Sequence, residues 1–243
     1  MKAIILAAGN GIRMRPLTDV LPKPLLSVGR LTLLDHLISK LPSEIDELVI
    51  VVRHLSFKIK NYCGPEFYDR KVTYVDQPKN LHGTFAALKI CEKILKKGER
   101  FFVLYADDLM SPKSVKECLK HKYAIVASEV SNPTSFGVLE LKKDGTLAAI
   151  LEKPEKSPTN LVLTNILLLD TKILKFNPPV NANGEQYLTH AVCDLAKLEK
   201  INIVKTNKWL PVGYPEDLKK AEVFVKGPVS TKTTGKHFRS VYR

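Results

Sequence analysis

Residues 1–18 read MKAIILAAGNGIRMRPLT. The apolar run Ile4–Leu6 is typical of a short buried strand, and it leads into small residues and two glycines. Arg13 and Arg15 follow, and Lys23 comes a few residues later. Glycines let backbone N–H groups approach phosphate oxygens, and cations offset the phosphate charge. The stretch therefore predicts a strand that ends in a polyphosphate-binding loop.

This loop fits neither of two common phosphate-binding motifs. A P-loop closes its glycine turn with Lys followed by Ser or Thr, and the turn here has no such pair. A dinucleotide fingerprint needs a third glycine, and Met14 stands at that position after Gly9 and Gly11. The loop therefore indicates another class of nucleotide site.

A longer ordered pattern surrounds the loop. It reads Leu6-Ala7-Ala8-Gly9-x-Gly11-x-Arg13-Met14-x-Pro16-Leu17-Thr18, with Lys23-Pro24 downstream. The pattern resembles the signature of the sugar-1-phosphate nucleotidylyltransferases, in the branch that makes UDP-, dTDP- and similar NDP-sugars. The resemblance implies a three-layer α/β fold with a mostly parallel sheet, Rossmann-like and similar to glycosyltransferase A. It also implies joining of an NTP to a sugar 1-phosphate, with Mg²⁺ and release of pyrophosphate.

Composition is that of an ordinary soluble protein. The 243 residues are 44% hydrophobic and 26% charged, enough for one α/β domain with a substantial core. The chain has no apolar run of about 18 residues and no signal-peptide pattern, so we expect no membrane segment. Its four cysteines are scattered without a C-x-x-C pair, which argues against structural zinc and secreted disulfides. We therefore expect a reducing cytoplasm.

The net charge of +13 has three explanations: nucleic acid, a phosphorylated substrate or a lysine-rich surface. Residues 226–243 hold five basic residues and no acid, so the rest of the chain carries +8. No nucleic-acid motif or interleaving of aromatic and basic residues appears. We therefore interpret the excess as a solvated lysine face and expect an NTP and a sugar 1-phosphate as partners. The sequence is compatible with a homo-oligomer.

Short β-branched runs alternate with helical spacing of apolar residues in the first half. The expected strands are 4–6, 48–52, 72–75, 101–104 and 124–127, and the expected helices are 33–41 and 85–95. Such alternation favours βαβ units and a parallel sheet, with ligands at the carboxyl ends of the strands.

The second half has a different pattern. Asp144-Gly145 between two apolar runs predicts a hairpin of 136–141 with 147–152. A strand at 160–170 and helices at 185–198 and 216–225 follow. We expect one domain over 1–225, with a nucleotide-binding half at 1–132, a sugar-binding half at 133–225 and a basic tail at 226–243.

Arg13 and Lys23 are the candidate phosphate-binding side chains. The reaction brings two anions together and moves negative charge onto pyrophosphate, so it needs cations. The resemblance implies that Arg13 contacts the β- and γ-phosphates and that Lys23 lies near the phosphates. It also implies nucleotide contacts from the loop residues Leu6, Ala7, Ala8, Gly9 and Gly11. For Arg15 a plain surface position is an equal alternative.

A second segment, DQPKNLHGTFAAL at 76–88, is the candidate base site. Gln77 at a strand end can offer an acceptor and donors to a base edge. Gly83 allows backbone to lie close to the base, and Thr84 is expected to cap the next helix. The resemblance implies that Gln77 and Gly83 contact the base, with uracil or thymine favoured over guanine. We interpret His82 as a bystander.

Asp107 and Asp108 follow the apolar run 101–104. A carboxylate at the end of a buried strand is costly unless it binds something, and Mg²⁺ bridging carboxylate and phosphate meets that need. The resemblance implies that Asp107 is the metal ligand and that Asp108 is a helix cap or a supporting group. The alternative, capping of a helix at 111–119, is expected for one of the two aspartates.

The sugar half contains Phe136-Gly137-Val138 and Glu152-Lys153-Pro154, which match family segments. The resemblance implies that Gly137 and Glu152 bind the sugar and that Lys153 pairs with the sugar phosphate. The sugar phosphate is already a nucleophile, so catalysis needs mainly alignment and charge neutralisation. The segment 183–189 also resembles the family, but His190 stands where the family has aspartate.

One departure bears on the metal. In Trp209-Leu210-Pro211-Val212-Gly213, Pro211 stands where the family's second metal aspartate is expected. One carboxylate can suffice because Mg²⁺ keeps water and phosphate ligands. The alternatives are a non-catalytic paralogue that binds nucleotide sugar and regulates a partner, a cytidylyl- or guanylyltransferase of the same fold, and a nucleic-acid-associated protein.

Overall fold

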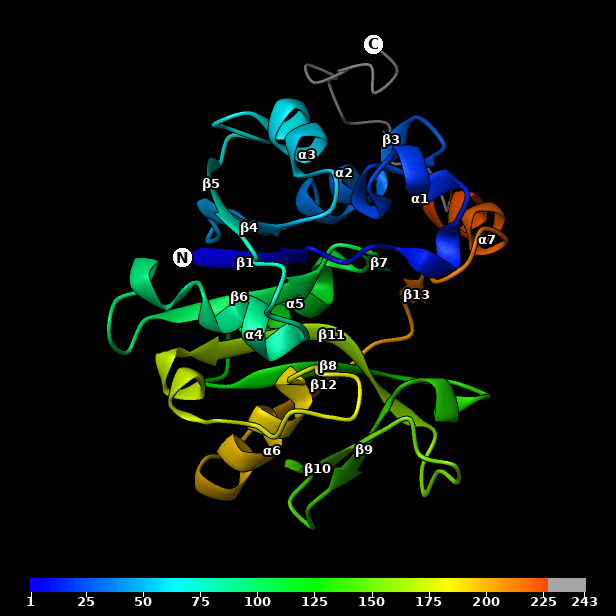
Figure 1. The fold of residues 1–243 in the computed structure, drawn as a ribbon. Helices are drawn as coiled ribbons and strands as arrows, with labels where there is room; N and C mark the ends of the chain where they lie inside the picture. The colour runs from blue at the N-terminus through cyan, green and yellow to red at the C-terminus, as the bar shows by residue number, and fades with distance from the viewer. Residues whose placement is uncertain (227–243) are drawn as a thin grey trace.

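The strand that precedes the glycine loop lies inside a mixed sheet. The computed structural model describes residues 1–226, so the predicted tail lies outside the described residues except for Lys226. Over that range a nine-stranded sheet has the order β10-β9-β11-β6-β1-β4-β5, with β8 paired to β11 and β12 paired to β8 (Figure 1).

Four neighbouring strands of the first half are parallel. They are β1 (Lys2–Ala7), β4 (Glu47–Val52), β5 (Lys71–Asp76) and β6 (Arg100–Tyr105). The predicted strands are confirmed, and each is one to three residues longer than expected. Ala7 lies opposite Val52, and Val52 lies opposite Asp76. The loops that follow these strands therefore share one edge of the sheet.

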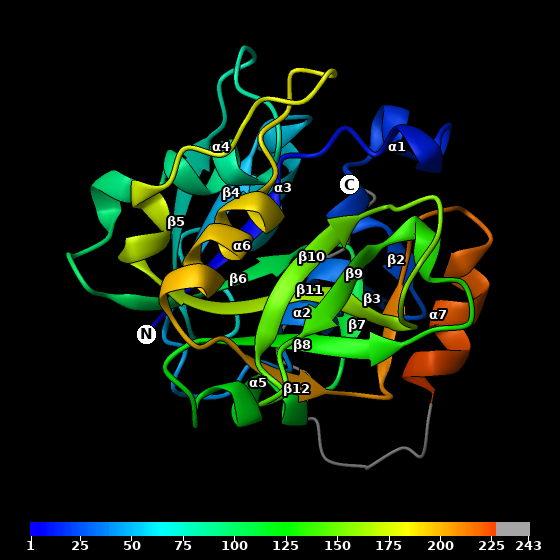
Figure 2. The ribbon, with the colours of Figure 1, turned by 90° about the horizontal axis from the view of Figure 1, so that it is seen from below.

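The second half is mainly antiparallel. It contains β9 (Gly137–Leu141), β10 (Leu147–Glu152), β11 (Leu161–Asp170) and β12 (Asn202–Lys205), which join β8 (Ala124–Glu129), the last strand of the first half. β11 runs antiparallel to both β6 and β8, and β9 and β10 form the predicted hairpin. Figure 2 looks onto this half. The sheet is thus parallel where the glycine loop leaves it and mostly antiparallel beyond β6, although β12 runs parallel to β8.

Helices cover both faces of the sheet. Ala3 and Ile5 of β1 pack in one core with α2 (Leu33–Ile38), α3 (Ser56–Cys63) and α5 (Pro112–Cys118). Ile4 points to the other face, into a core with α4 (Thr84–Lys89) and α6 (Leu188–Leu198). Side chains alternate along a strand, so one buried strand serves two cores. The predicted three-layer α/β architecture is confirmed.

Some boundaries differ from the expected ones. The helix expected at 85–95 is α4 followed by the 3-10 turn η3 (Glu92–Ile94), and the helix expected from 185 begins at Leu188. The other 3-10 turns are η1 (Ile12–Met14), η2 (Lys23–Leu25), η4 (Pro133–Ser135) and η5 (Thr171–Lys175).

The capping role expected for one of the two aspartates is wrong. Ser111 caps α5, since its hydroxyl accepts from the Lys113 N–H. The short strand β7 (Asp108–Met110) separates the aspartates from the helix.

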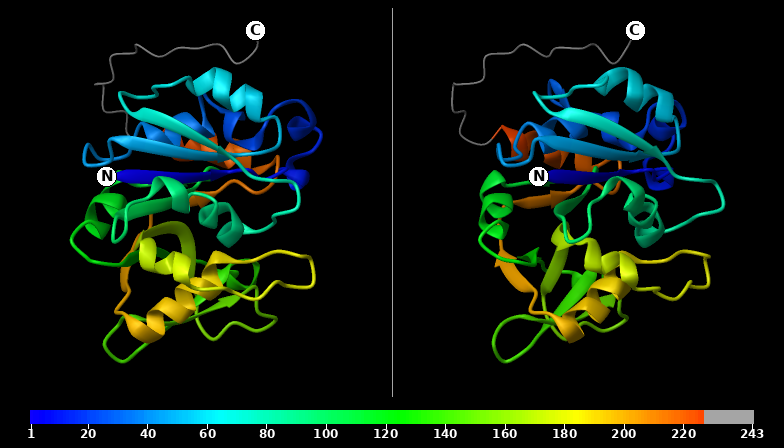
Figure 3. Two further views of the ribbon diagram at one scale, coloured as in Figure 1. Left: turned by 60° about the vertical axis from the view of Figure 1, so that its left-hand side comes forward. Right: turned by 90° about the vertical axis from the view of Figure 1, so that its left-hand side faces the viewer.

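The end of the described chain returns to the first half. β13 (Trp209–Pro211) pairs with β7, and α7 (Asp217–Val225) packs near β2 (Ser27–Val28), which pairs with β3 (Leu31–Thr32). Figures 1 and 3 show α7 above the level of β13, on the side of α1 (Leu17–Val20). Within residues 1–226, no helix has the length and apolar character needed to span a bilayer.

Candidate active site

A cavity of about 780 Å³ opens at the shared carboxyl edge of the parallel strands. This volume suits a small-molecule ligand. Its lining includes eleven residues of the predicted site: Leu6, Ala7, Ala8, Gly9, Gly11, Arg13, Lys23, Gln77, Gly83, Asp107 and Lys153. Residues from both halves of the sequence therefore meet around one space.

The absence of a side chain has a different physical explanation at Gly9 than at Gly11. Gly11 has φ +63°, and a Cβ there would lie 2.8 Å from the Thr18 Cγ2. The Thr18 hydroxyl also donates to the Gly11 carbonyl at 2.8 Å. A Cβ at Gly9 would meet no protein atom within 4 Å, although Gly9 lines the cavity. Gly11 is therefore required by the turn, whereas Gly9 leaves space that a ligand can use.

We expect Gly9→Ala and Gly11→Ala to separate binding from stability. Gly11→Ala should destabilise the protein by about 1–3 kcal/mol, because it adds a left-handed residue and a steric clash. Gly9→Ala should leave the unfolding midpoint nearly unchanged and weaken binding of the expected nucleotide about tenfold, because its methyl group occupies ligand space. Thermal unfolding and titration calorimetry measure the two effects. Equal loss of stability in both variants would contradict this assignment.

Cations outnumber carboxylates around the cavity. Its lining includes Arg13, Lys23, Arg53 and Lys153 against Asp107 and Glu185. The Lys23 ammonium is nearly buried and lies 2.7 Å from the Asp107 Oδ2. Such a surplus of positive charge in a concave site attracts a polyanion.

Two further cations, Lys153 and Arg15, differ in their surroundings. Lys153 has φ +44°, a rare conformation for a non-glycine residue that is typical of functional sites. Arg15 forms an ion pair with Asp19 at 3.0 Å, and its side chain is 60% exposed. Of the two interpretations of Arg15, the surface position is the one that this ion pair favours.

Asp108 is a buried supporting group. Its Oδ2 accepts from the Trp209 indole N–H at 2.9 Å and from the Asn165 amide at 3.1 Å. Burial, together with the neighbouring Asp107 charge, raises the pKa of Asp108 to about 8. Asn165 has φ +59° at an irregularity of β11. Asp108 therefore joins β7 to the second half and does not line the cavity.

The residues present fit a metal held by one protein carboxylate. The Asp107 side chain is 35% exposed and lines the cavity. Pro211 lies opposite Asp108 in the β13–β7 ladder, so no carboxylate comes from that strand. Residues 1–226 contain no group of three His, Cys, Asp or Glu arranged for a metal. Asp107 with phosphate oxygens and water matches the coordination that Mg²⁺ accepts.

The base loop is attached to the sugar-half loop. A Cβ at Gly83, which has φ +94°, would lie 2.3 Å from the Gln186 carbonyl oxygen. The Gln186 N–H donates to the His82 carbonyl at 3.1 Å, and the Phe85 N–H donates to the Gln186 carbonyl at 2.9 Å. The protein backbone that approaches Gly83 is thus that of Gln186.

The expected helix cap at Thr84 is wrong. Gly83 is the N-cap residue of α4 and has no side chain to cap with. The Thr84 hydroxyl instead accepts from the Leu188 N–H at 2.9 Å. Gln77, in contrast, is buried at the cavity wall, and its Nε2 donates to the Leu81 carbonyl at 3.0 Å. This bond fixes the amide orientation beside the expected base.

Sequence reasoning did not identify several lining residues. Arg53 directly follows β4, and its Nη1 lies 3.3 Å from Nδ1 of His82, which we interpreted as a bystander. Tyr105 ends β6. Arg53, His82 and Tyr105 all lie at or after the carboxyl ends of strands. The rule that ligands bind at these ends could therefore have indicated Arg53 and Tyr105.

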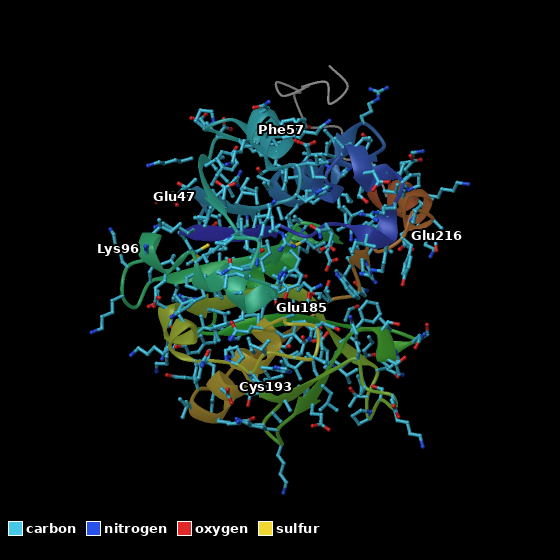
Figure 4. All side chains as sticks on the ribbon, viewed as in Figure 1. Glu47, Phe57, Lys96, Glu185, Cys193 and Glu216 are labelled. Atoms are coloured by element: carbon cyan, nitrogen blue, oxygen red, sulfur yellow. The ribbon has the colours of Figure 1, made fainter. Side chains whose placement is uncertain are left out.

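The two residues predicted to bind the sugar, Gly137 and Glu152, lie near each other but outside the cavity lining. They lie opposite each other in the hairpin. The Glu152 Oε2 accepts from the Thr189 hydroxyl at 3.3 Å. Asn183 and Glu185 line the cavity instead, and Figure 4 shows Glu185 near the middle of the molecule. The sugar-binding roles of Gly137 and Glu152 stay predictions.

The comparison with known families follows from this arrangement. The model of the nucleotidyl transferase family matches residues 2–227. The chain belongs to the nucleotidyl transferase family. The predicted family relationship is therefore confirmed over nearly the whole described range.

Two curated relatives agree with this membership. The chain is 32% identical over 239 residues to the bifunctional protein GlmU of Methanocaldococcus jannaschii, covering 97% of this chain and 57% of that protein. It is 29% identical over 230 residues to a mannose-1-phosphate guanyltransferase of Aspergillus fumigatus, covering 89% and 62%. The chain thus spans little more than half the length of these curated relatives.

The structural match covers both chains almost completely. A crystal structure assigned to a glucose-1-phosphate thymidylyltransferase of Bacillus anthracis superposes with a TM-score of 0.84, at 27% identity and 98% coverage of each chain. The predicted nucleotidyltransferase fold is confirmed.

Proposed function

We propose that this protein transfers a nucleotidyl group from an NTP to a sugar 1-phosphate, giving an NDP-sugar and pyrophosphate. The observation that carries the proposal is the convergence of the Gly9 loop, Arg13, Lys23 and Asp107 around one cavity. The wider division into a nucleotide half at 1–132 and a sugar half at 133–225 is part of this proposal.

The proposed chemistry is an in-line displacement at phosphorus. A sugar-phosphate oxygen attacks the α-phosphorus, the bond to the bridging oxygen breaks, and pyrophosphate leaves with that electron pair. Arg13 and Lys23 would stabilise the charge that develops on the leaving group. Lys153 would hold the attacking phosphate in line from the opposite half of the chain, so no covalent intermediate on the protein is needed.

A Mg²⁺ ion held by Asp107 and phosphate oxygens would supply additional positive charge for the triphosphate. Lys23 is hydrogen-bonded to the same carboxylate. Lys23 would therefore orient Asp107 and neutralise phosphate charge from within the wall of the cavity.

We propose UTP or dTTP as the favoured donor. Gln77 supports this choice because its amide can accept from N3–H and donate to a carbonyl oxygen of uracil or thymine. The guanyltransferase among the relatives makes GTP the main competitor. A cytoplasmic location is part of the proposal, and its support is that all four cysteines are free.

A non-catalytic nucleotide-sugar binder is the second candidate. The observation in its favour is Pro211, which brings no carboxylate to the strand opposite Asp108. Such a protein would bind nucleotide sugar in the same cavity and regulate a partner.

One assay separates the two functions. The full chain is incubated with Mg²⁺, each of UTP, dTTP, CTP, GTP and ATP, and a panel of sugar 1-phosphates, and pyrophosphate release is measured. The enzyme proposal predicts turnover that is fastest with UTP or dTTP. Nucleotide-sugar binding without turnover across the panel would favour the regulator, and fastest turnover with GTP would overturn the donor assignment alone.

A further inference from the structure

The segment 209–217 lies directly beside Asp107 and Arg13, two residues that we expect to act at the phosphates of the nucleotide. The Val212 N–H donates to the Asp107 carbonyl at 3.2 Å. Gly213 lines the cavity, and a Cβ added there would lie 3.9 Å from the Arg13 Nη1. A segment some 200 residues from Arg13 in sequence therefore forms part of its immediate surroundings.

Tyr214 is the aromatic partner of Arg13. The Arg13 guanidinium carbon lies 5.1 Å from the centroid of the Tyr214 ring. This separation is within the range of a cation–π interaction. Arg13 has no ion pair with a carboxylate of residues 1–226, unlike its neighbour Arg15. The Tyr214 ring is therefore the contact that directs this exposed guanidinium.

Hydrogen bonds hold Tyr214 in place. The Asp217 Oδ2 accepts from the Gly213 N–H at 3.0 Å and from the Tyr214 N–H at 2.9 Å. Asp217 begins α7, and Ala221 of that helix is buried in one core with Met14, the residue after Arg13. Both partners of the ring–cation contact are thus anchored in the same small core.

Tyr214 does not serve as a core residue itself. Tyr214 is 47% exposed, and it is not part of the core around Met14 and Ala221. A half-exposed tyrosine buries less area than a core tyrosine, and the contact of its ring face with the guanidinium is independent of that core. The position of the ring is therefore better explained by Arg13 than by packing.

We propose that Tyr214 is a positioning residue that holds the Arg13 guanidinium at the cavity before the triphosphate binds. The inference rests on the proposed function, because it assigns Arg13 to the triphosphate. A free arginine side chain loses rotamer entropy when it binds phosphate, and a stacked guanidinium has lost part of it in advance. The segment that lacks the second carboxylate would still serve the site by aligning a cation.

A double-mutant cycle on the full chain tests this inference. Dissociation constants for UTP and dTTP with Mg²⁺ are measured by calorimetry for wild type, Tyr214→Ala, Arg13→Ala and the double variant, together with KM and kcat where turnover is found. Tyr214→Ala should weaken nucleotide binding about three- to tenfold, the range of a cation–π contact. The KM for the sugar 1-phosphate should not change.

Two further results distinguish positioning from a merely structural role. Tyr214→Phe keeps the ring face and should bind nucleotide like wild type. The double variant should bind no worse than Arg13→Ala alone, since the ring acts only through Arg13. Glu216→Gln, at an exposed position of the same turn (labelled in Figure 4), is the control and should change nothing.

Two outcomes would contradict the positioning role of Tyr214. Additive effects of the two alanine substitutions, or nucleotide affinity of Tyr214→Ala within twofold of wild type at an unchanged unfolding midpoint, would overturn the inference. Failure of the proposed function looks different, because wild-type protein would then bind none of the five NTPs of the assay; where another NTP is the donor, the same cycle is measured with that NTP. Binding without turnover leaves the cycle fully measurable.

Discussion

Lys23→Met should lower kcat/KM by about 10²- to 10³-fold, the loss typical of removing one electrostatic group from a preorganised site. The Lys23 ammonium is nearly buried, lies 2.7 Å from Asp107 and lines the cavity. Methionine has a similar shape but no charge, so it keeps the packing and removes the cation that pairs with Asp107 at the cavity wall. Steady-state pyrophosphate release measures the effect.

Lys205→Met is the matched control for this substitution. Lys205 forms an ion pair with Glu129 at 3.2 Å, and both side chains are more than 60% exposed. Exposed ion pairs contribute about 0–1 kcal/mol, so activity and stability should stay near wild type. Activity of Lys23→Met within threefold of wild type would show that the buried cation has no part in the reaction.

Asp107→Asn should produce the second large loss, about 10³-fold in kcat, together with loss of the response to Mg²⁺. The substitution preserves shape and removes the one carboxylate charge that we assign to the metal. The Val212 N–H binds the Asp107 main-chain carbonyl, so the local backbone should not change. Activity is measured as a function of Mg²⁺ concentration.

Pro211→Asp is the complementary variant. The residue after Pro211, Val212, binds the Asp107 carbonyl, so a carboxylate introduced at position 211 would lie near Asp107 and is expected to add a second metal ligand. Half-maximal activity should then need less Mg²⁺ than in wild type. An unchanged Mg²⁺ requirement in Pro211→Asp, with full Mg²⁺ response in Asp107→Asn, would refute the single-carboxylate site.

Local sequence patterns were sufficient for the framework of this fold. Each β-branched run of the first half became a strand because a buried parallel strand needs little more than short apolar sequence. Asp144-Gly145 predicted its hairpin because the turn requires the positive φ that Gly145 adopts. The rule that ligands lie at carboxyl ends of strands also predicted that the Gly9 loop and Asp107 would lie at one site, and both line the cavity.

Contacts between distant segments were beyond reach of the sequence. Thr84 looks like a helix cap, but its hydroxyl binds Leu188, 104 residues away. Gly83, whose contact with the base stays a prediction, has no room for a side chain because the Gln186 backbone lies where its Cβ would be. The ring of Tyr214 meets Arg13 only because α7 returns to the core of Met14. Such pairs leave no local period or spacing.

The central claim is that the glycine loop and its cations bind a nucleoside triphosphate. A crystal structure of the full chain with UTP or dTTP and Mg²⁺ tests it most directly. We expect the phosphates beside Gly9, Arg13 and Lys23 and the base beside Gln77. Ordered nucleotide at another site, with this cavity empty, would contradict the account.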